Sequence, residues 1–159
     1  MLGALYLHPV FHALPHGALW EGRTFENLRV YQLAETLADR IWKVVLKWDH
    51  FAKSTIGEQI VDAVDGIGSN LAEGTGRGSL RDNRRFVKIA RGSLYETKHW
   101  LRRAYQRKLL TEQDICDLKP IVDELLPTLN AYFRSLNEAI HKTETKHKAQ
   151  STKLKNRSS

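Results

Sequence analysis

Residues 69–86 have the sequence SNLAEGTGRGSLRDNRRF, and this stretch determines how the chain is arranged. One helical pattern of apolar residues ends here, and another begins after Gly74, Gly76 and Gly78. A dinucleotide-binding fingerprint needs a strand before its glycines, and a Walker loop needs a lysine followed by Ser or Thr. The stretch has neither, so we interpret it as a reversal between two helices rather than a phosphate cradle.

The reversal has an expected local structure. Gly74 is predicted to end the first of these helices in a left-handed cap, with Gly76 and Gly78 making the turn. Ser79 is predicted to cap the next helix. The free amides at that helix N-terminus are also suited to an RNA phosphate.

Outward from this stretch, four segments carry apolar residues every three or four positions, as one face of a helix does. No segment alternates like a strand. Four helices of about 20–28 residues with short connections favour an all-α fold, an antiparallel up-down-up-down four-helix bundle. The expected core positions are Val30, Ala34, Leu37, Ile41, Val45 and Trp48; Ile56, Ile60, Val64, Ile67 and Leu71; Phe86, Ile89, Ala90, Leu94, Leu101 and Ala104; and Ile115, Leu118, Val122, Leu125, Leu129, Tyr132, Leu136 and Ile140.

Helix starts and a bend are also predicted. Three pairs have capping-box spacing: Thr55 with Glu58, Ser79 with Asp82, and Thr111 with Asp114. Pro120 and Pro127 fall inside the fourth pattern, whose apolar stripe keeps its phase across them. We therefore expect one helix bent at Pro127 rather than two short helices.

Small residues inside the helices point to close helix contacts. Gly66, Gly68 and Gly92 each cost about 1 kcal/mol relative to alanine in a helix interior, which close approach of two helices would offset. The face that carries Gly66 and Gly74 also carries Ala63 and Asn70, and it is expected to meet Ala90 and Ser93 of the next helix. Asn70 and Glu73 are expected to bond the adjoining turn.

The 159 residues fit one domain with tails. We expect a poorly ordered extension over 1–22, the bundle over 23–140 and a disordered basic tail over 141–159. No apolar run is long enough for a membrane span. The one cysteine, Cys116, excludes an internal disulfide, and a reducing, cytoplasmic setting is expected.

Charge is unevenly distributed along the chain. Residues 1–76 carry −3, 77–108 carry +9, 109–140 carry −4 and 141–159 carry +5, for a net +7. Cations of the third helix repeat at intervals of three, four or seven, and therefore share one face with Tyr95. A basic face with an aromatic residue suits phosphate contact and base stacking. The candidate nucleic-acid-binding residues are Arg77, Arg81, Arg84, Arg85, Lys88, Arg91, Tyr95, Lys98 and Arg102.

Catalysis has little support in the sequence. No Ser/His/Asp set or Glu-x-x-His pair occurs. His8, His12 and His16 have helical spacing, but Pro9 and Pro15 disfavour a regular helix there, so we expect no metal site on them. Cys116 is interpreted as a packing residue, and His99 as a solvent-facing or packing residue. Trp42, Trp48 and Trp100 fit core or interface positions. We expect no enzyme activity, no cofactor and no metal.

Three stretches resemble a known family: FENLRVYQLA (25–34), SNLAEGTGR (69–77) and ARGSLYE (90–96). They resemble four-helix-bundle proteins encoded by intervening sequences within bacterial large-subunit ribosomal RNA genes. Accessory variability proteins of diversity-generating retroelements are related to these. The resemblance covers roughly Phe25 to Leu136, and its motif residues include Asn70, Glu73, Gly74 and Gly92.

The resemblance implies an antiparallel bundle that assembles into a ring, commonly a homopentamer with a basic surface. In the retroelement relatives, it implies a ring that binds a reverse transcriptase and nucleic acid. Val61 and Asp62 stand where many members have two arginines, and Gly68 stands where they have a proline. The second helix is therefore the poorer candidate for nucleic-acid contact.

Two roles remain open for the basic face. In the first role, it binds structured RNA, single strands or a nucleic-acid enzyme, with little sequence specificity. In the second role, it serves assembly by pairing with acidic helices. The acidic residues that motivate the second role are Glu35, Asp39, Asp62, Asp65, Asp123 and Glu124. The basic tail alone could also bind polyanions.

Overall fold

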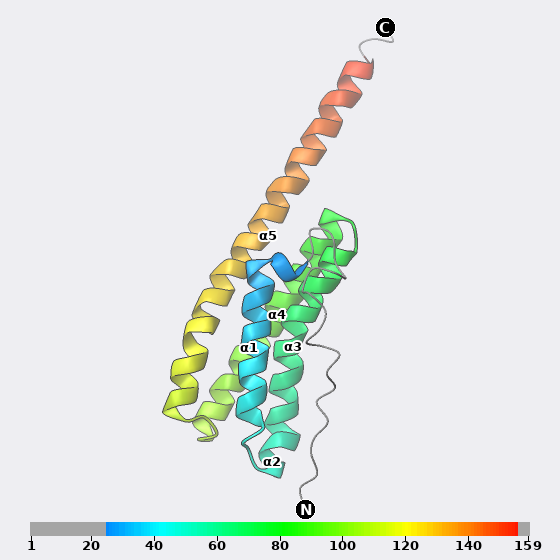
Figure 1. Cartoon of the computed structure of the whole chain (residues 1–159). Coiled ribbons are helices and arrows are strands. Elements are labelled where there is room, and N and C mark those ends of the chain that lie inside the picture. The colour runs from blue at the N-terminus through cyan, green and yellow to red at the C-terminus, as the bar shows by residue number, and fades with distance from the viewer. Residues whose placement is uncertain (1–24, 156–159) are drawn as a thin grey trace, which may run out of the picture.

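The computed structural model describes residues 25–155, which form a bundle of four long helices with no strand in this range (Figure 1). This confirms the predicted all-α four-helix bundle. The elements are the 3-10 turn η1 (Phe25–Asn27), α1 (Arg29–Val45), the short α2 (His50–Ala52), the π-helical turn η2 (Lys53–Gly57), α3 (Glu58–Gly76), α4 (Leu80–Gln106) and α5 (Glu112–Lys155).

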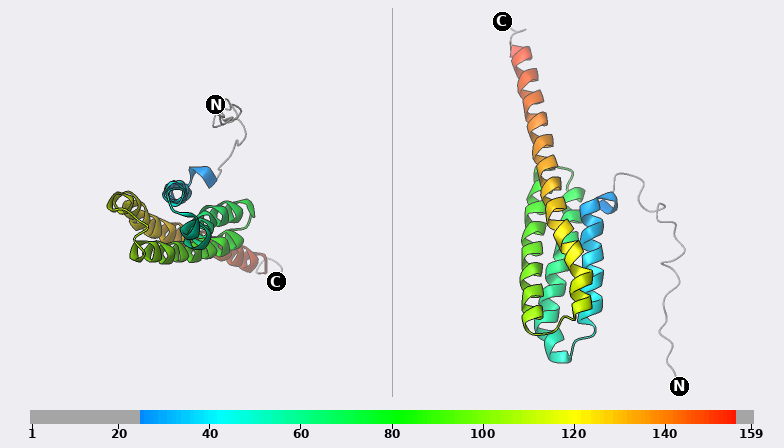
Figure 2. Two further views of the ribbon diagram at one scale, coloured as in Figure 1. Left: turned by 90° about the horizontal axis from the view of Figure 1, so that it is seen from below. Right: turned by 90° about the vertical axis from the view of Figure 1, so that its left-hand side faces the viewer.

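Each long helix has two neighbours in the bundle. Both α1 and α4 pack against α3 and α5, so α1 and α4 lie diagonally across from each other. The side formed by α1 and α3 is therefore opposite the side formed by α4 and α5. Because successive helices are antiparallel, α1 and α4 both end where α2 lies, which we call the α2 end. The other end carries the N-terminus of α4 and the C-terminal part of α5, which extends past the bundle (Figures 1 and 2).

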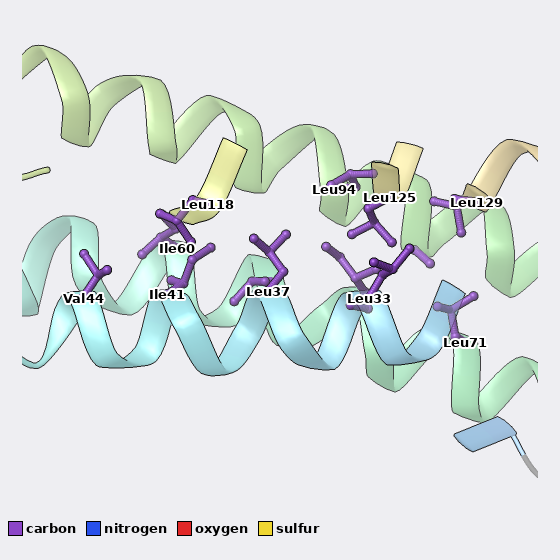
Figure 3. Close-up of a cluster of buried hydrophobic side chains, with 14 of the residues drawn as sticks. Leu33, Leu37, Ile41, Val44, Ile60, Leu71, Leu94, Leu118, Leu125 and Leu129 are labelled. Atoms are coloured by element: carbon purple, nitrogen blue, oxygen red, sulfur yellow. The ribbon is translucent and has the colours of Figure 1, made fainter. Parts of the chain in front are cut away.

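The core is aliphatic, and leucines and isoleucines from all four helices fill it (Figure 3). Every core position predicted for the first two segments is buried. The third segment contains one error, because Ile89 is 43% exposed while Val87 is 1% exposed. In α4 the buried face follows Phe86, Ala90 and Leu94, and Ile89 lies off that face. In the fourth segment the predicted core positions are buried, except that Ile115, Val122 and Tyr132 are only partly buried.

The predicted close approach of two helices occurs between α3 and α4. A Cβ atom added to Gly66 would lie 3.0 Å from Ser93 Oγ. At Gly74 an added Cβ atom would lie 2.8 Å from the Cβ atom of Phe86 and 3.3 Å from the Cα atom of Asn83. Gly92, by contrast, has no atom within 4 Å of an added Cβ and is exposed, so close packing does not explain it.

The reversal between α3 and α4 differs from the prediction in one respect. Gly74 is buried within α3, and the helix continues to Gly76. The left-handed residue is Gly78, with φ of 69°. Gly74 is therefore required by close packing rather than by a cap, and α3 ends one turn later than expected. The predicted cap at Ser79 is confirmed, because its Oγ accepts from the Asp82 amide at 3.3 Å.

The other two predicted caps have different outcomes. Thr111 and Asp114 form a reciprocal box, with the Thr111 amide donating to Asp114 at 2.9 Å and the Asp114 amide donating to Thr111 at 3.1 Å. The prediction that Thr55 and Glu58 cap a helix is wrong. The helix begins earlier, where Asp49 accepts from the Ala52 amide at 2.9 Å, and Thr55 donates to the Phe51 carbonyl inside the continuous helix.

Asp114 also ties α5 to the turn after α1. Its carboxylate lies 3.4 Å from Lys47 Nζ. Burial raises the pKa of Asp114, but hydrogen bonds from Thr111 and the charge of Lys47 more than offset this and hold the pKa below its usual value.

The helix α5 runs unbroken through Pro120 and Pro127, and Figure 1 shows it as one curved helix. The disorder predicted from residue 141 is wrong for the described residues, because α5 continues to Lys155. A long packed helix has already met the cost of nucleation, and Lys, Glu, Gln and Ala beyond Ile140 propagate it readily.

The side chain of Cys116 is exposed, so Cys116 is not the packing residue that the sequence pattern predicted.

The N-terminal extension predicted over residues 1–22 lies outside the residues that the structure describes. Within the described range, no helix is both long and apolar enough to cross a membrane.

The close approach at Gly74 predicts opposite effects of alanine at two motif glycines. Gly74→Ala should lower the free energy of unfolding by about 1–3 kcal/mol, because its methyl group has no room beside Phe86. Gly92→Ala is the matched control and should raise it by about 1 kcal/mol through helix propensity. Urea unfolding followed by circular dichroism measures both. Equal effects at the two sites would contradict the close packing.

Candidate nucleic-acid interface

The predicted basic face lies on α4 along its seam with α5. Helical spacing places its members on one side of α4, and the structure brings α5 against that side. We call this set the α4 stripe, consisting of Arg81, Arg84, Lys88, Arg91, Tyr95, Lys98 and Arg102. The stripe divides into two halves with different surroundings.

In the half nearest the N-terminus of α4, side chains of α5 position the cations. Arg81 forms an ion pair with Glu144 at 2.6 Å, and Arg84 Nη1 donates to Asn137 Oδ1 at 3.1 Å. Lys88 and Arg91 both lie over the ring of Phe133, at 5.8 and 5.5 Å from its centroid. The cationic groups are thus held along the seam rather than extended freely into solvent.

Arg77 and Arg85 lie beside this half. Their guanidinium groups lie 5.2 and 4.7 Å from the ring centroid of Phe86. Arg77, the residue after α3, also pairs with Glu73. Glu73 therefore bonds the adjoining turn as predicted. Asn70 does not, because its Nδ2 donates to the Gly66 carbonyl within α3 at 2.6 Å.

The other half of the stripe borders an open groove between α4 and α5. Lys98 and Arg102 line this groove, whose volume is about 520 Å³. Tyr95 is 56% exposed, and the ammonium of Lys98 lies 6.0 Å from its ring centroid. An exposed aromatic ring beside a cation is a surface on which a base can stack.

Few carboxylates neutralise the α4 stripe. Among the described side chains, Arg81 is the one cation of the stripe in an ion pair. The hydrogen bond and charge of Arg81, with the charges of His141 and Lys148, hold the pKa of Glu144 below its usual value. The remaining cations are available to an anion.

Acidic residues collect on the opposite side of the bundle. Asp39 of α1 and Asp62 of α3 lie close enough to Asp65 of α3 for their charges to act on it. Burial, followed by the charges of Asp62 and Asp39, raises the pKa of Asp65. Asp39, Asp62 and Asp65 therefore form a carboxylate cluster on the α1/α3 side, opposite the α4 stripe.

The part of the chain that the structure describes has no group of three or more His, Cys, Asp or Glu side chains placed to hold a metal ion. His99 is exposed and its ring packs edge-on against Trp100 at 5.0 Å. His8, His12 and His16 lie outside the described residues.

Sequence reasoning missed the residues of α5 that organise the stripe. Phe133, Asn137 and Glu144 share one face of α5 by their spacing. That spacing was a usable signal, but the predicted disorder after residue 140 concealed its last member. Lys119 and Tyr105, which border the groove, were also missed.

Comparison with known proteins gives one family match. The model of a family described as 23S rRNA-intervening sequence protein matches residues 26–131, well over half of the chain. No curated protein matches the chain. The matched range contains the α4 stripe and ends before the part of α5 that carries Phe133, Asn137 and Glu144.

The Arg81–Glu144 pair predicts how Glu144 titrates. Arg81→Gln should return the pKa of Glu144 toward its usual value, because the main cause of the shift is removed. Carboxyl-carbon NMR titration measures this pKa. Arg77→Gln, which removes a cation that pairs with Glu73 instead, should leave it unchanged. A Glu144 pKa in the usual range in the unaltered protein would show that the Arg81–Glu144 ion pair does not form in solution.

Proposed function

The chain belongs to the 23S rRNA-intervening sequence protein family, and we propose that it is a cytoplasmic, non-enzymatic protein that binds nucleic acid through the α4 stripe. The ligand class is structured RNA or a single strand, recognised mainly through its phosphates. A nucleic-acid enzyme such as a retroelement reverse transcriptase is the protein partner in the same proposal. No cofactor or catalytic step is part of it.

The observation that carries this proposal is a row of cations held in place without carboxylates. Arg84 is fixed by a neutral amide, and Lys88 and Arg91 by an aromatic ring. Such partners orient a cation but leave its charge uncompensated. A phosphate backbone can then replace the counterions along the row, which provides most of the free energy of non-specific binding.

Two neighbouring features extend the row. Tyr95 offers an exposed ring for stacking of an unpaired base. Beyond the bundle, α5 adds Lys142 and Lys146 at the end where Arg81 lies. A strand that follows the seam would therefore meet cations from two helices.

A second candidate function is assembly into a homo-oligomer, with a pentameric ring favoured by the family resemblance. The specific observation in its favour is the carboxylate cluster of Asp39, Asp62 and Asp65 opposite the α4 stripe, because it lets unlike surfaces of two copies meet. Exposed ion pairs contribute only about 0–1 kcal/mol each, so charge would orient such an interface more than stabilise it.

Nucleic-acid binding is tested by removing three cations of the stripe. Arg84→Gln, Lys88→Gln and Arg91→Gln together should weaken binding of a short labelled RNA at least about tenfold and reduce the log–log salt slope by about 2. Fluorescence anisotropy across a salt series measures both quantities. Lys43→Gln, Lys53→Gln and Arg107→Gln remove the same charge near the α2 end and serve as the matched control.

A second experiment distinguishes binding by the α4 stripe from binding by the C-terminal part of the chain. Protein ending at Ile140 retains the α4 stripe but loses the helical extension of α5. Binding that survives this truncation and falls in the stripe variant supports the proposal. Binding that disappears with the truncation and is unchanged in the stripe variant would assign it to the basic tail.

A further inference from the structure

Two large apolar side chains are exposed side by side on α1. Trp42 is 54% exposed and Leu46 is 56% exposed, and they are four residues apart on α1 and the turn that follows it. They line a groove of about 510 Å³ between α1 and the start of α3. Single exposed apolar residues are ordinary, but an adjacent tryptophan and leucine on the rim of a groove are typical of a contact surface.

Carboxylates lie on one side of this apolar pair. Glu58 and Asp62 of α3 line the same groove, and Asp39 lies three residues before Trp42 on α1, outside the groove lining. We call these four residues the acidic ridge: Asp39, Trp42, Leu46 and Asp62. His50 and Lys53 line the groove at the α2 end. The ridge is apolar at its centre, with the carboxylates of Asp39 and Asp62 beside Trp42 and the cation of Lys53 at its α2 end.

The groove between α4 and α5 has the complementary character. Its floor is formed by Leu101, Leu110, Leu118 and Val122, and its rim by Lys98, Arg102, Lys119 and Tyr105. We call it the basic groove. Tyr105 is 60% exposed at this rim. Lys119 pairs with Asp123 of its own helix, whereas Lys98 and Arg102 have no ion pair among the described side chains.

The two surfaces lie at the same level on opposite sides of the bundle. The ridge is at the end of α1 and the start of α3, and the groove is at the end of α4 and the start of α5. In an antiparallel bundle these four segments meet at one end, the α2 end (Figures 1 and 2). Two copies placed side by side with parallel axes would therefore bring the ridge of one level with the groove of the other.

We propose that the acidic ridge of one copy docks in the basic groove of a second copy, with Trp42 and Leu46 against the leucine floor and Asp39 and Asp62 facing Lys98 and Arg102. The inference rests on the assembly proposed above and names its interface. Apolar contact supplies the affinity and charge complementarity sets the orientation.

This contact is head-to-tail. A pair of copies leaves one ridge and one groove unfilled, so further copies add until a ring closes or a filament grows. The contact uses Lys98 and Arg102 but leaves Arg84, Lys88 and Arg91 uncovered. In the assembled protein, phosphate binding would therefore use the half of the α4 stripe that carries Arg84, Lys88 and Arg91.

The experiment disables one surface at a time in the full chain. Trp42→Glu removes the ridge, and Arg102→Glu removes the groove. Each variant alone should associate at least about 30-fold more weakly than the unaltered protein, as expected for a central interface residue. An equimolar mixture should form a one-to-one dimer and nothing larger, because only one intact ridge and one intact groove remain. Light scattering coupled to size-exclusion chromatography measures the masses, at low and high salt.

Matched controls are Phe51→Glu, at an apolar residue 77% exposed that lies outside both surfaces, and Arg107→Glu. Both should assemble like the unaltered protein. Leu46→Glu provides a second ridge variant, and circular dichroism verifies that every variant is folded.

Three results would overturn the inference. If the unaltered protein assembles and both variants assemble equally well, the protein is an oligomer but this interface is wrong. Variants that dissociate and do not pair when mixed show that the two surfaces do not meet. An unaltered protein that is monomeric at all concentrations and salts rejects the assembly itself and this interface with it.

Discussion

Gly74 of α3 lies so close to α4 that an added Cβ atom would be 2.8 Å from the Cβ atom of Phe86. This approach determines how α4 is seated in the bundle. With α4 held there, Phe86 is buried, and Asn83 Nδ2 donates to the Tyr132 hydroxyl of α5 at 2.9 Å. The rotation of α4 fixed by these contacts directs Arg84, Lys88 and Arg91 to the seam with α5. A requirement for one small residue thus places the cations on which the proposed function depends.

Much of the fold follows from local patterns in the sequence. Every core position predicted for α1 and α3 is buried, because both helices present a regular apolar face. Leu33 and Val44 of α1 are also buried but were not predicted. The predictions were wrong where contacts with other helices determine which residues are buried or required to be small. Ile89 is apolar but lies off the buried face of α4, and Gly74 is required by a neighbouring helix rather than by its own turn. The helix past Ile140 was missed because periodicity reports packing, whereas this segment is helical without an apolar face.

The cations of the candidate site could be predicted because they lie on one helix, α4. Their partners on α5 could not be predicted. Spacing alone grouped the cations of the α4 stripe, since residues three, four and seven apart share a helix face. Their partners Asn137 and Phe133 are more than 40 positions away in sequence, and only the packing of α5 brings them together. The groove beside Lys98 and Arg102 likewise exists only once α4 and α5 are assembled, so no single segment indicates it.

The extension of α5 has a consequence for any assembly of parallel copies. It projects from the end of the bundle opposite to α2, whereas the ridge and the groove lie at the α2 end (Figure 1). All extensions would then point in one direction and form a crown of positively charged helices. One long polyanion could contact several of them at once, so weak individual contacts would gain avidity from their number. A single copy, with only one projecting helix, would have no such advantage.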